Sequence, residues 1–70
     1  MNNTIKRTST TVIYTNLIDT SAGKKGEVFK AVKDAYGWHA QNITTNDTTI
    51  YYCFLSMLRN ENVTRIIEQY

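Results

Sequence analysis

The sequence predicts a small single α+β domain with the element order β-α-β-β-α. In this arrangement two helices cover one face of a three-stranded sheet that contains antiparallel strands. Three observations favour it: an alternating segment near the N-terminus, apolar residues at helical spacing in the middle and at the end of the chain, and a long apolar run at residues 48–58. We expect residues 1–70 to form one domain, with residues 1–8 frayed.

The first strand is expected at residues 5–18, with the strongest signal at residues 10–18, where apolar, β-branched and polar residues alternate. Before residue 10 the segment is polar, which is typical of a frayed end or an edge. One face would carry Val12, Tyr14, Asn16 and Ile18, and the other Thr11, Ile13, Thr15 and Leu17.

Residues 19–26 contain two glycines and small polar residues, so we expect a loop there. A helix is expected to follow, beginning at Lys24 or Gly26 and ending at Tyr36, with Gly37 as the residue just after its end. The apolar positions that favour this helix recur at i, i+4, i+7 and i+8, and they are Val28, Val32, Ala35 and Tyr36.

The longest apolar run, residues 48–58, begins with β-branched and aromatic residues that favour a strand. Both faces of this strand would be apolar, which predicts a central strand covered on both sides or a strand at a dimer contact. The competing interpretation is a helix capped by Asn46 or Asp47, and residues 55–58 are expected to turn helical in either case. Read as a strand, one face carries Ile50, Tyr52, Phe54 and Ser56, and the other Tyr51, Cys53, Leu55 and Met57.

The segments on either side of this run complete the prediction. Residues 38–45 alternate weakly and precede Asn46-Asp47, so a hairpin from Trp38 through Phe54 with a tight turn is expected. At the C-terminus a short amphipathic helix is expected, capped by Asn60 or Asn62. Its apolar positions, at i, i+3, i+4 and i+7, are Val63, Ile66, Ile67 and Tyr70.

Composition limits how so short a chain can be stabilised. A domain of 70 residues buries only ~60% of its extended-chain surface. Cys53 is the only cysteine and His39 the only histidine, which excludes an intrachain disulfide and argues against a structural zinc site. Self-association is the remaining way to add stability, so a homodimer is expected. With no apolar stretch near the ~20 residues of a membrane span and no signal peptide, we predict a cytoplasmic protein with no membrane partner.

The net charge of +2 is mildly basic and does not by itself predict nucleic-acid binding. The loop at residues 21–26 could hold a phosphate on free backbone amides, but it lacks the spacing of a P-loop, and Glu27 places a negative charge there. The candidate residues for binding nucleic acid or an anion are Lys6, Arg7, Lys24, Lys25, Lys30 and Lys33.

Aromatic residues are the candidates for a protein interface, because Tyr and Trp combine a large contact area with a polar tip. A strand that is apolar on both faces also has more apolar surface than two short helices on one side can cover, which favours a protein partner. The interface candidates are Trp38, Tyr51, Tyr52 and Tyr70, with Tyr36 beside them.

Catalysis has little support in the sequence. His39 has no evident carboxylate to orient it, and Cys53 lies in an apolar run that favours an inert buried thiol. We therefore predict no catalytic residue, no cofactor and no metal site.

The predicted function is that of a small non-enzymatic protein that binds and inhibits or regulates a host protein. The Asn-, Thr- and Lys-rich composition without proline suggests a phage or mobile-element origin. The alternative is a nucleic-acid-binding regulator that uses the lysines of residues 24–33.

Overall fold

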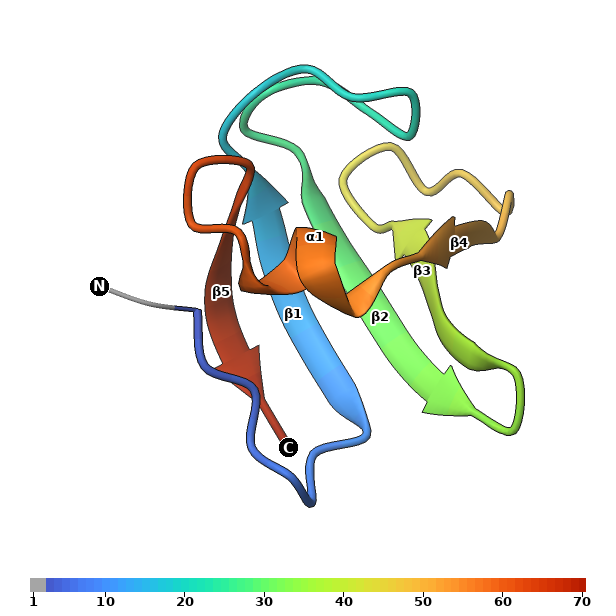
Figure 1. Cartoon of the computed structure of the whole chain (residues 1–70). Coiled ribbons are helices and arrows are strands. Elements are labelled where there is room, and N and C mark those ends of the chain that lie inside the picture. The colour runs from blue at the N-terminus through green and yellow to red at the C-terminus, as the bar shows by residue number, and fades with distance from the viewer. Residues whose placement is uncertain (1–2) are drawn as a thin grey trace.

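The structure, a computed structural model, describes residues 3–70 as one antiparallel sheet crossed by a short helix (Figure 1). The order of the strands across the sheet is β4-β3-β2-β1-β5, and every neighbouring pair is antiparallel. The predicted α+β fold with three strands and two helices is therefore wrong. The elements are β1 (Thr11–Asn16), β2 (Val28–Asp34), β3 (Gly37–Asn42), β4 (Tyr51–Cys53), α1 (Leu55–Arg59) and β5 (Thr64–Gln69).

The first strand is confirmed for residues 11–16, with the two predicted faces, but residues 5–10 and 17–18 lie outside it. Val12, Tyr14 and Asn16 are buried on the side of the sheet that α1 covers, while Thr11 and Ile13 point to the opposite side. Alternation at a period of two therefore identified which residues share a side of the strand, while the position of α1 decides which side is buried.

The predicted helix at residues 24–36 is instead β2, which pairs with β1 on one side and with β3 on the other. Val28 and Val32 are four residues apart, a spacing that fits one face of a helix and one face of a strand equally well. Hydrogen-bonded pairing of this segment with β1 and with β3 stabilises the strand rather than the helix. Gly37 does have a positive φ of 115°, but it closes the β2–β3 hairpin rather than a helix.

The predicted C-terminal helix is also a strand, β5, paired with β1. Its register shifts between Ile13 and Tyr14 of β1, which pair with Glu68 and Ile66, so Ile67 is the extra residue of a β-bulge. The bulge interrupts the alternation of β5. As a result, its apolar residues recur at the spacing of a helix.

The strand interpretation of residues 48–54 is confirmed only for residues 51–53, which form β4, and the helical end at residues 55–58 is confirmed as part of α1. Trp38 of β3 pairs with Cys53 of β4, so the predicted hairpin also forms. Its connection is a longer loop than predicted, in which Asn46 has a positive φ of 56°. The expectation of a central strand is wrong, because β4 is at one edge of the sheet.

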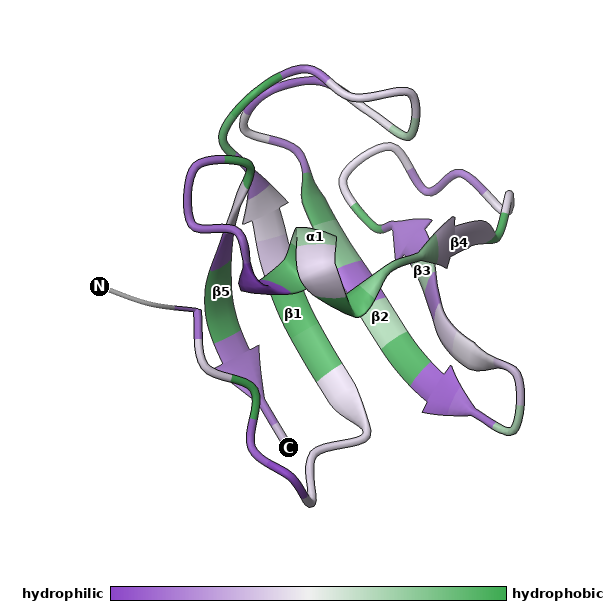
Figure 2. Cartoon of the chain, viewed as in Figure 1, coloured by the Kyte–Doolittle hydropathy of each residue, from purple (hydrophilic) through white to green (hydrophobic). Residues whose placement is uncertain are grey.

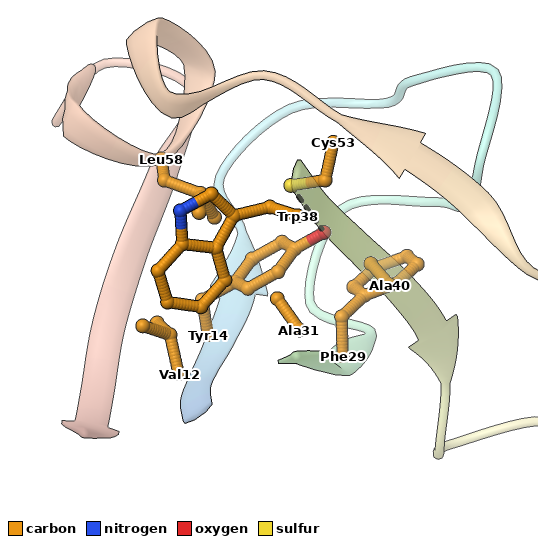
Figure 3. Packing of buried hydrophobic residues seen from close by; sticks show 8 residues of the cluster. All are labelled: Val12, Tyr14, Phe29, Ala31, Trp38, Ala40, Cys53 and Leu58. Carbon is orange, nitrogen blue, oxygen red and sulfur yellow. Dashed lines mark hydrogen bonds between the residues drawn. The ribbon is translucent and has the colours of Figure 1, made fainter. Parts of the chain in front are cut away.

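The core lies between α1 and one face of the sheet. Figure 1 shows α1 crossing this face over β1 and β2 on its way from one edge strand to the other. Leu58 is the buried residue of α1 and packs with Trp38 and the stacked rings of Tyr14 and Phe29, whose centroids are 5.2 Å apart (Figure 3). The sheet therefore has one covered face and one open face.

The end of α1 is joined to the start of β5 by a buried threonine. The Thr64 hydroxyl lies 3.1 Å from the carbonyl oxygen of Met57 and 3.4 Å from that of Leu58, and it can donate to either. The last carbonyls of a helix have no partner within the helix, so this side chain supplies one where water is excluded. The contact fixes the position of α1 over the sheet.

The predicted fraying of residues 1–8 falls partly on residues 1–2, which lie outside the described residues. Residues 3–8 run beside β5 and are attached to it by side chains. Asn3 Nδ2 donates to the carbonyl oxygen of Thr64 at 2.6 Å, and Gln69 accepts from the Lys6 amide at 2.7 Å.

Among residues 3–70, no helix has the length and apolar character needed to cross a membrane.

Replacing Leu58 with alanine should lower the free energy of unfolding by about 3 kcal/mol, because the leucine is fully buried and holds α1 on the core. Chemical denaturation followed by tryptophan fluorescence measures the change, since Trp38 lies in the same core. Ile50→Ala is the matched control: Ile50 is 64% exposed, and its loss should cost less than about 0.5 kcal/mol. Equal losses in the two variants would contradict this assignment of the core.

Candidate protein-binding surface

The face of the sheet that α1 leaves uncovered is the main candidate for a functional surface, and we call it the open face. The strand register places its residues in rows across the sheet, because directly paired residues point to the same side. Its strand residues are Thr11, Ile13 and Thr15 of β1, Val28, Lys30, Val32 and Asp34 of β2, His39 and Gln41 of β3, Tyr52 of β4, and Arg65 and Glu68 of β5.

Most of the exposed large hydrophobic residues lie on the open face or on its rim, by which we mean the segments that directly continue its strands. Nine large hydrophobic side chains are exposed among residues 3–70, and strand pairing and ring contacts place six of them on the open face or where its strands continue. Antiparallel sheets that face water on one side normally carry polar residues there, so this concentration makes the open face the candidate binding surface. The six residues on the open face or its rim are Val32, Ile43, Ile50, Tyr52, Phe54 and Tyr70.

Three rings form a continuous aromatic strip along the β3–β4 side of the open face. The rings of His39 and Tyr52 meet edge to face at 5.2 Å, and those of Tyr52 and Phe54 at 5.3 Å. Tyr52 and Phe54 are nevertheless 60% and 64% exposed. The Tyr52 hydroxyl donates to the carbonyl oxygen of Tyr36 at 2.9 Å, which anchors the strip to the β2–β3 turn. The strip is therefore fixed in place before any partner arrives.

The expectation that His39 lacks a neighbouring carboxylate is wrong. Its Nδ1 lies 3.2 Å from Oδ2 of Asp34, in the geometry of an ion pair rather than of a hydrogen bond. The other Asp34 oxygen accepts the Tyr36 amide at 2.7 Å and shapes the turn. A groove beside β5 and a small cavity beside Cys53 are both lined by other residues, so the pair faces neither of them.

The predicted basic residues do not form one cluster. Lys24 and Lys25 lie in the loop that precedes β2, whereas Lys33 lies near the opposite end of that strand. The five residues of extended chain from the start of β2 to Lys33 span about 17 Å. Lys6 and Arg7 are in the N-terminal segment, and Lys30 lies on the open face. Figure 1 shows the N-terminal segment and the loop before β2 at opposite ends of the sheet.

The loop at residues 21–26 does not offer the free amides that a phosphate site would need. The Lys24 amide donates to Oε1 of Glu27 at 2.6 Å, and the Lys25 amide donates to Oδ1 of Asp19 at 2.8 Å. The loop also does not begin a helix, so no helix dipole favours an anion there. A β-carbon at Gly23 would lie 2.6 Å from Cζ of Phe29, which shows how tightly the loop packs.

The predicted interface aromatics divide between the two faces. Trp38 is buried in the core, and Tyr51 is half-buried, with its hydroxyl donating to Oδ2 of Asp47 at 3.2 Å. This bond raises the pKa of Tyr51, while the Thr49 amide lowers the pKa of Asp47. Tyr52 and Tyr70 are exposed, as an interface requires.

Two residues of the surface, Ile50 and Phe54, were not among the predicted site residues. The alternation around Tyr52 placed both on its side of the strand, so the signal was present in the sequence. Whether that side would be covered or bare was not visible, because it depends on where β4 lies in the sheet.

Cys53 is buried between the sheet and α1, 4.0 Å from the hydroxyl of Tyr14 (Figure 3). Burial raises the pKa of its thiol to about 11, so it is protonated at neutral pH and a poor nucleophile. Burial, with a smaller effect of Cys53, also raises the pKa of Tyr14. Among residues 3–70, no group of three or more His, Cys, Asp or Glu residues is placed to hold a metal ion.

The two sheet edges are poor places for another strand to add. β4 has only three residues. β5 is bent by its bulge, carries Arg65 and Glu68, and is flanked by the N-terminal segment, with a groove of about 860 Å³ between them. Short edges, bulges and charged side chains all discourage strand pairing. Binding through the open face is therefore favoured over binding at an edge.

Comparison of the chain with protein-family models, curated proteins and solved structures found no match. The geometry of the open face thus carries the functional inference.

Alkaline pH should destabilise the fold through Cys53. The thiol ionises near pH 9 in the unfolded chain but near pH 11 in the folded one, so its contribution to stability is complete below pH 9 and is lost as pH rises from 9 to 11. The loss should be about 2 kcal/mol. It is measured by urea unfolding at several pH values.

Cys53→Ala supplies the comparison, because it removes this titration and leaves those of Tyr14 and the surface tyrosines. The difference in stability between wild type and variant should shrink above pH 9. A difference that stays constant to pH 11 would show that the thiol is not buried as described.

Proposed function

We propose that this chain is a small binding protein without catalytic activity and that its open face binds a partner protein. The observation that carries the proposal is the gathering of exposed apolar side chains on one face of the sheet. Burial of Val32, Ile50, Tyr52 and Phe54 against a partner would remove them from water, which is the main source of binding free energy at protein interfaces.

The surface has the composition of a protein interface rather than of a nucleic-acid site. Aromatic rings alone would suit the stacking of bases, but here they are continuous with aliphatic Val32, Ile43 and Ile50. The charged strand residues of the open face are Lys30 and Arg65 together with Asp34 and Glu68, so no continuous positive strip crosses it. These features favour a protein partner over the nucleic-acid alternative.

A host protein that the chain inhibits or regulates in the cytoplasm is the proposed partner class. The phage or mobile-element origin stays a prediction, and so does the homodimer. A second copy and a host protein would both use the same face, so variants of that face test either one.

The double substitution Tyr52→Ser with Phe54→Ser should abolish partner binding, because it removes the two exposed rings of the aromatic strip. Proteins that co-purify with the tagged wild-type chain from the cells that encode it are quantified by mass spectrometry, and the specific ones should fall at least about tenfold with the variant. Sedimentation of the purified chain reports any self-association in the same way.

Ile18→Ser is the matched control, because Ile18 is an exposed apolar residue, 47% accessible, that lies beyond the end of β1 and is not among the strand residues of the open face. It should leave both readouts unchanged. The proposal fails if the double variant retains the same proteins as wild type and Ile18→Ser. A salt-sensitive mass increase with single-stranded RNA or DNA would favour the nucleic-acid alternative instead.

A further inference from the structure

We propose that the partner is an acidic, apolar protein segment that places a carboxylate on Lys30 while its apolar side chains cover the surrounding open face. This inference rests on the proposed function and specifies the chemistry of the partner. It follows from the position of one cation at the centre of the open face, where three of its four nearest neighbours are aliphatic.

Lys30 lies at the centre of the open face in both directions. Its strand, β2, is the middle one in the order β4-β3-β2-β1-β5. Across the sheet, Lys30 pairs with Ile13 on β1 and with Gln41 on β3. Along its own strand, Val28 and Val32 are the neighbours on the same face, so three of its four nearest side chains are aliphatic. In Figure 2 a hydrophilic segment interrupts the apolar stretch of β2.

No carboxylate of residues 3–70 pairs with Lys30. Asp34 pairs with His39, and Glu68 lies two strands away on β5, at roughly 10 Å by the spacing of strands in a sheet. A partner that covers the open face takes the Lys30 ammonium out of water. An unpaired buried charge is strongly unfavourable, so a tight partner has to bring an anion, and a carboxylate is the anion that proteins carry.

A second copy of the chain does not satisfy this requirement by stacking the whole open face on itself. A two-fold axis that overlays two complete faces maps the centre of one onto the centre of the other. Lys30 would then meet the Lys30 of the second copy, and two like charges would be buried together. The central lysine therefore favours a different protein, one with a negative charge at the matching position.

A library of random 12-residue peptides displayed on phage is the probe. Selection on the immobilised full chain should enrich peptides in which Asp or Glu is flanked by aliphatic or aromatic residues. Lys30→Met keeps the length of the side chain but removes its charge, so it should weaken the selected acidic peptides about tenfold or more while peptides without an acid bind unchanged. Lys30→Glu should select Lys or Arg in place of the acid.

Two controls separate local from general effects. Lys24→Glu makes the same change in net charge as Lys30→Glu but in the loop before β2, and it should leave the selected sequences unchanged. The variant Tyr52→Ser with Phe54→Ser should lose the selected peptides altogether, because it removes their apolar contacts on the open face.

Three outcomes would overturn the inference. In the first, the selected peptides require Tyr52 and Phe54 for binding but show no preference for acidic residues, which contradicts the inference and leaves the proposed function intact. In the second, single-stranded oligonucleotides bind at moderate salt and Lys30→Met abolishes this binding, which would show that the anion recognised by Lys30 is a phosphate and not a carboxylate. In the third, the chain forms a stable dimer that Lys30→Met strengthens and that Tyr52→Ser with Phe54→Ser dissociates, which would show that a second copy covers the open face. Selected peptides that survive the double variant would instead argue against the proposed function itself.

Discussion

The structure depends on a single crossing of the sheet by residues 54–63, which connect one edge strand to the other. β4 and β5 are at opposite edges, so the chain between them has to pass over a face of the sheet. The short α1 lies in this crossing, with Leu58 buried against the core and Thr64 holding the end of the helix. The covered face follows from this connection, and so do the buried positions of Trp38 and Cys53.

A chain of this length covers only one face in this way. The side of the sheet beneath α1 is buried by two-layer packing, whereas no second layer covers the opposite side within the described residues. Most of the exposed large hydrophobic side chains nevertheless lie on this opposite side, and the aromatic strip is held by contacts among its members and with the β2–β3 turn. This difference between the two faces connects the fold to the proposed function.

Lys30 gives the open face a chemical specificity that apolar area alone would lack. An apolar surface attracts many partners, including copies of the same chain, whereas an unpaired cation at its centre penalises every partner without a matching anion. In the proposed interaction, this one residue would affect both affinity and partner choice.

The sequence by itself determined which residues point to the same side in β1 and in the segment from Ile50 to Phe54 around β4, because alternation is unbroken there. It also determined that the chain becomes helical at Leu55. It did not determine β2, because Val28 and Val32 satisfy both a helical and a strand period. It did not determine β5, because the bulge at Ile67 produces helical spacing within a strand. Pairing with neighbouring strands decided both, and the order of the strands decided which apolar face stays bare. Those are contacts between segments distant in the chain, which local periodicity does not contain.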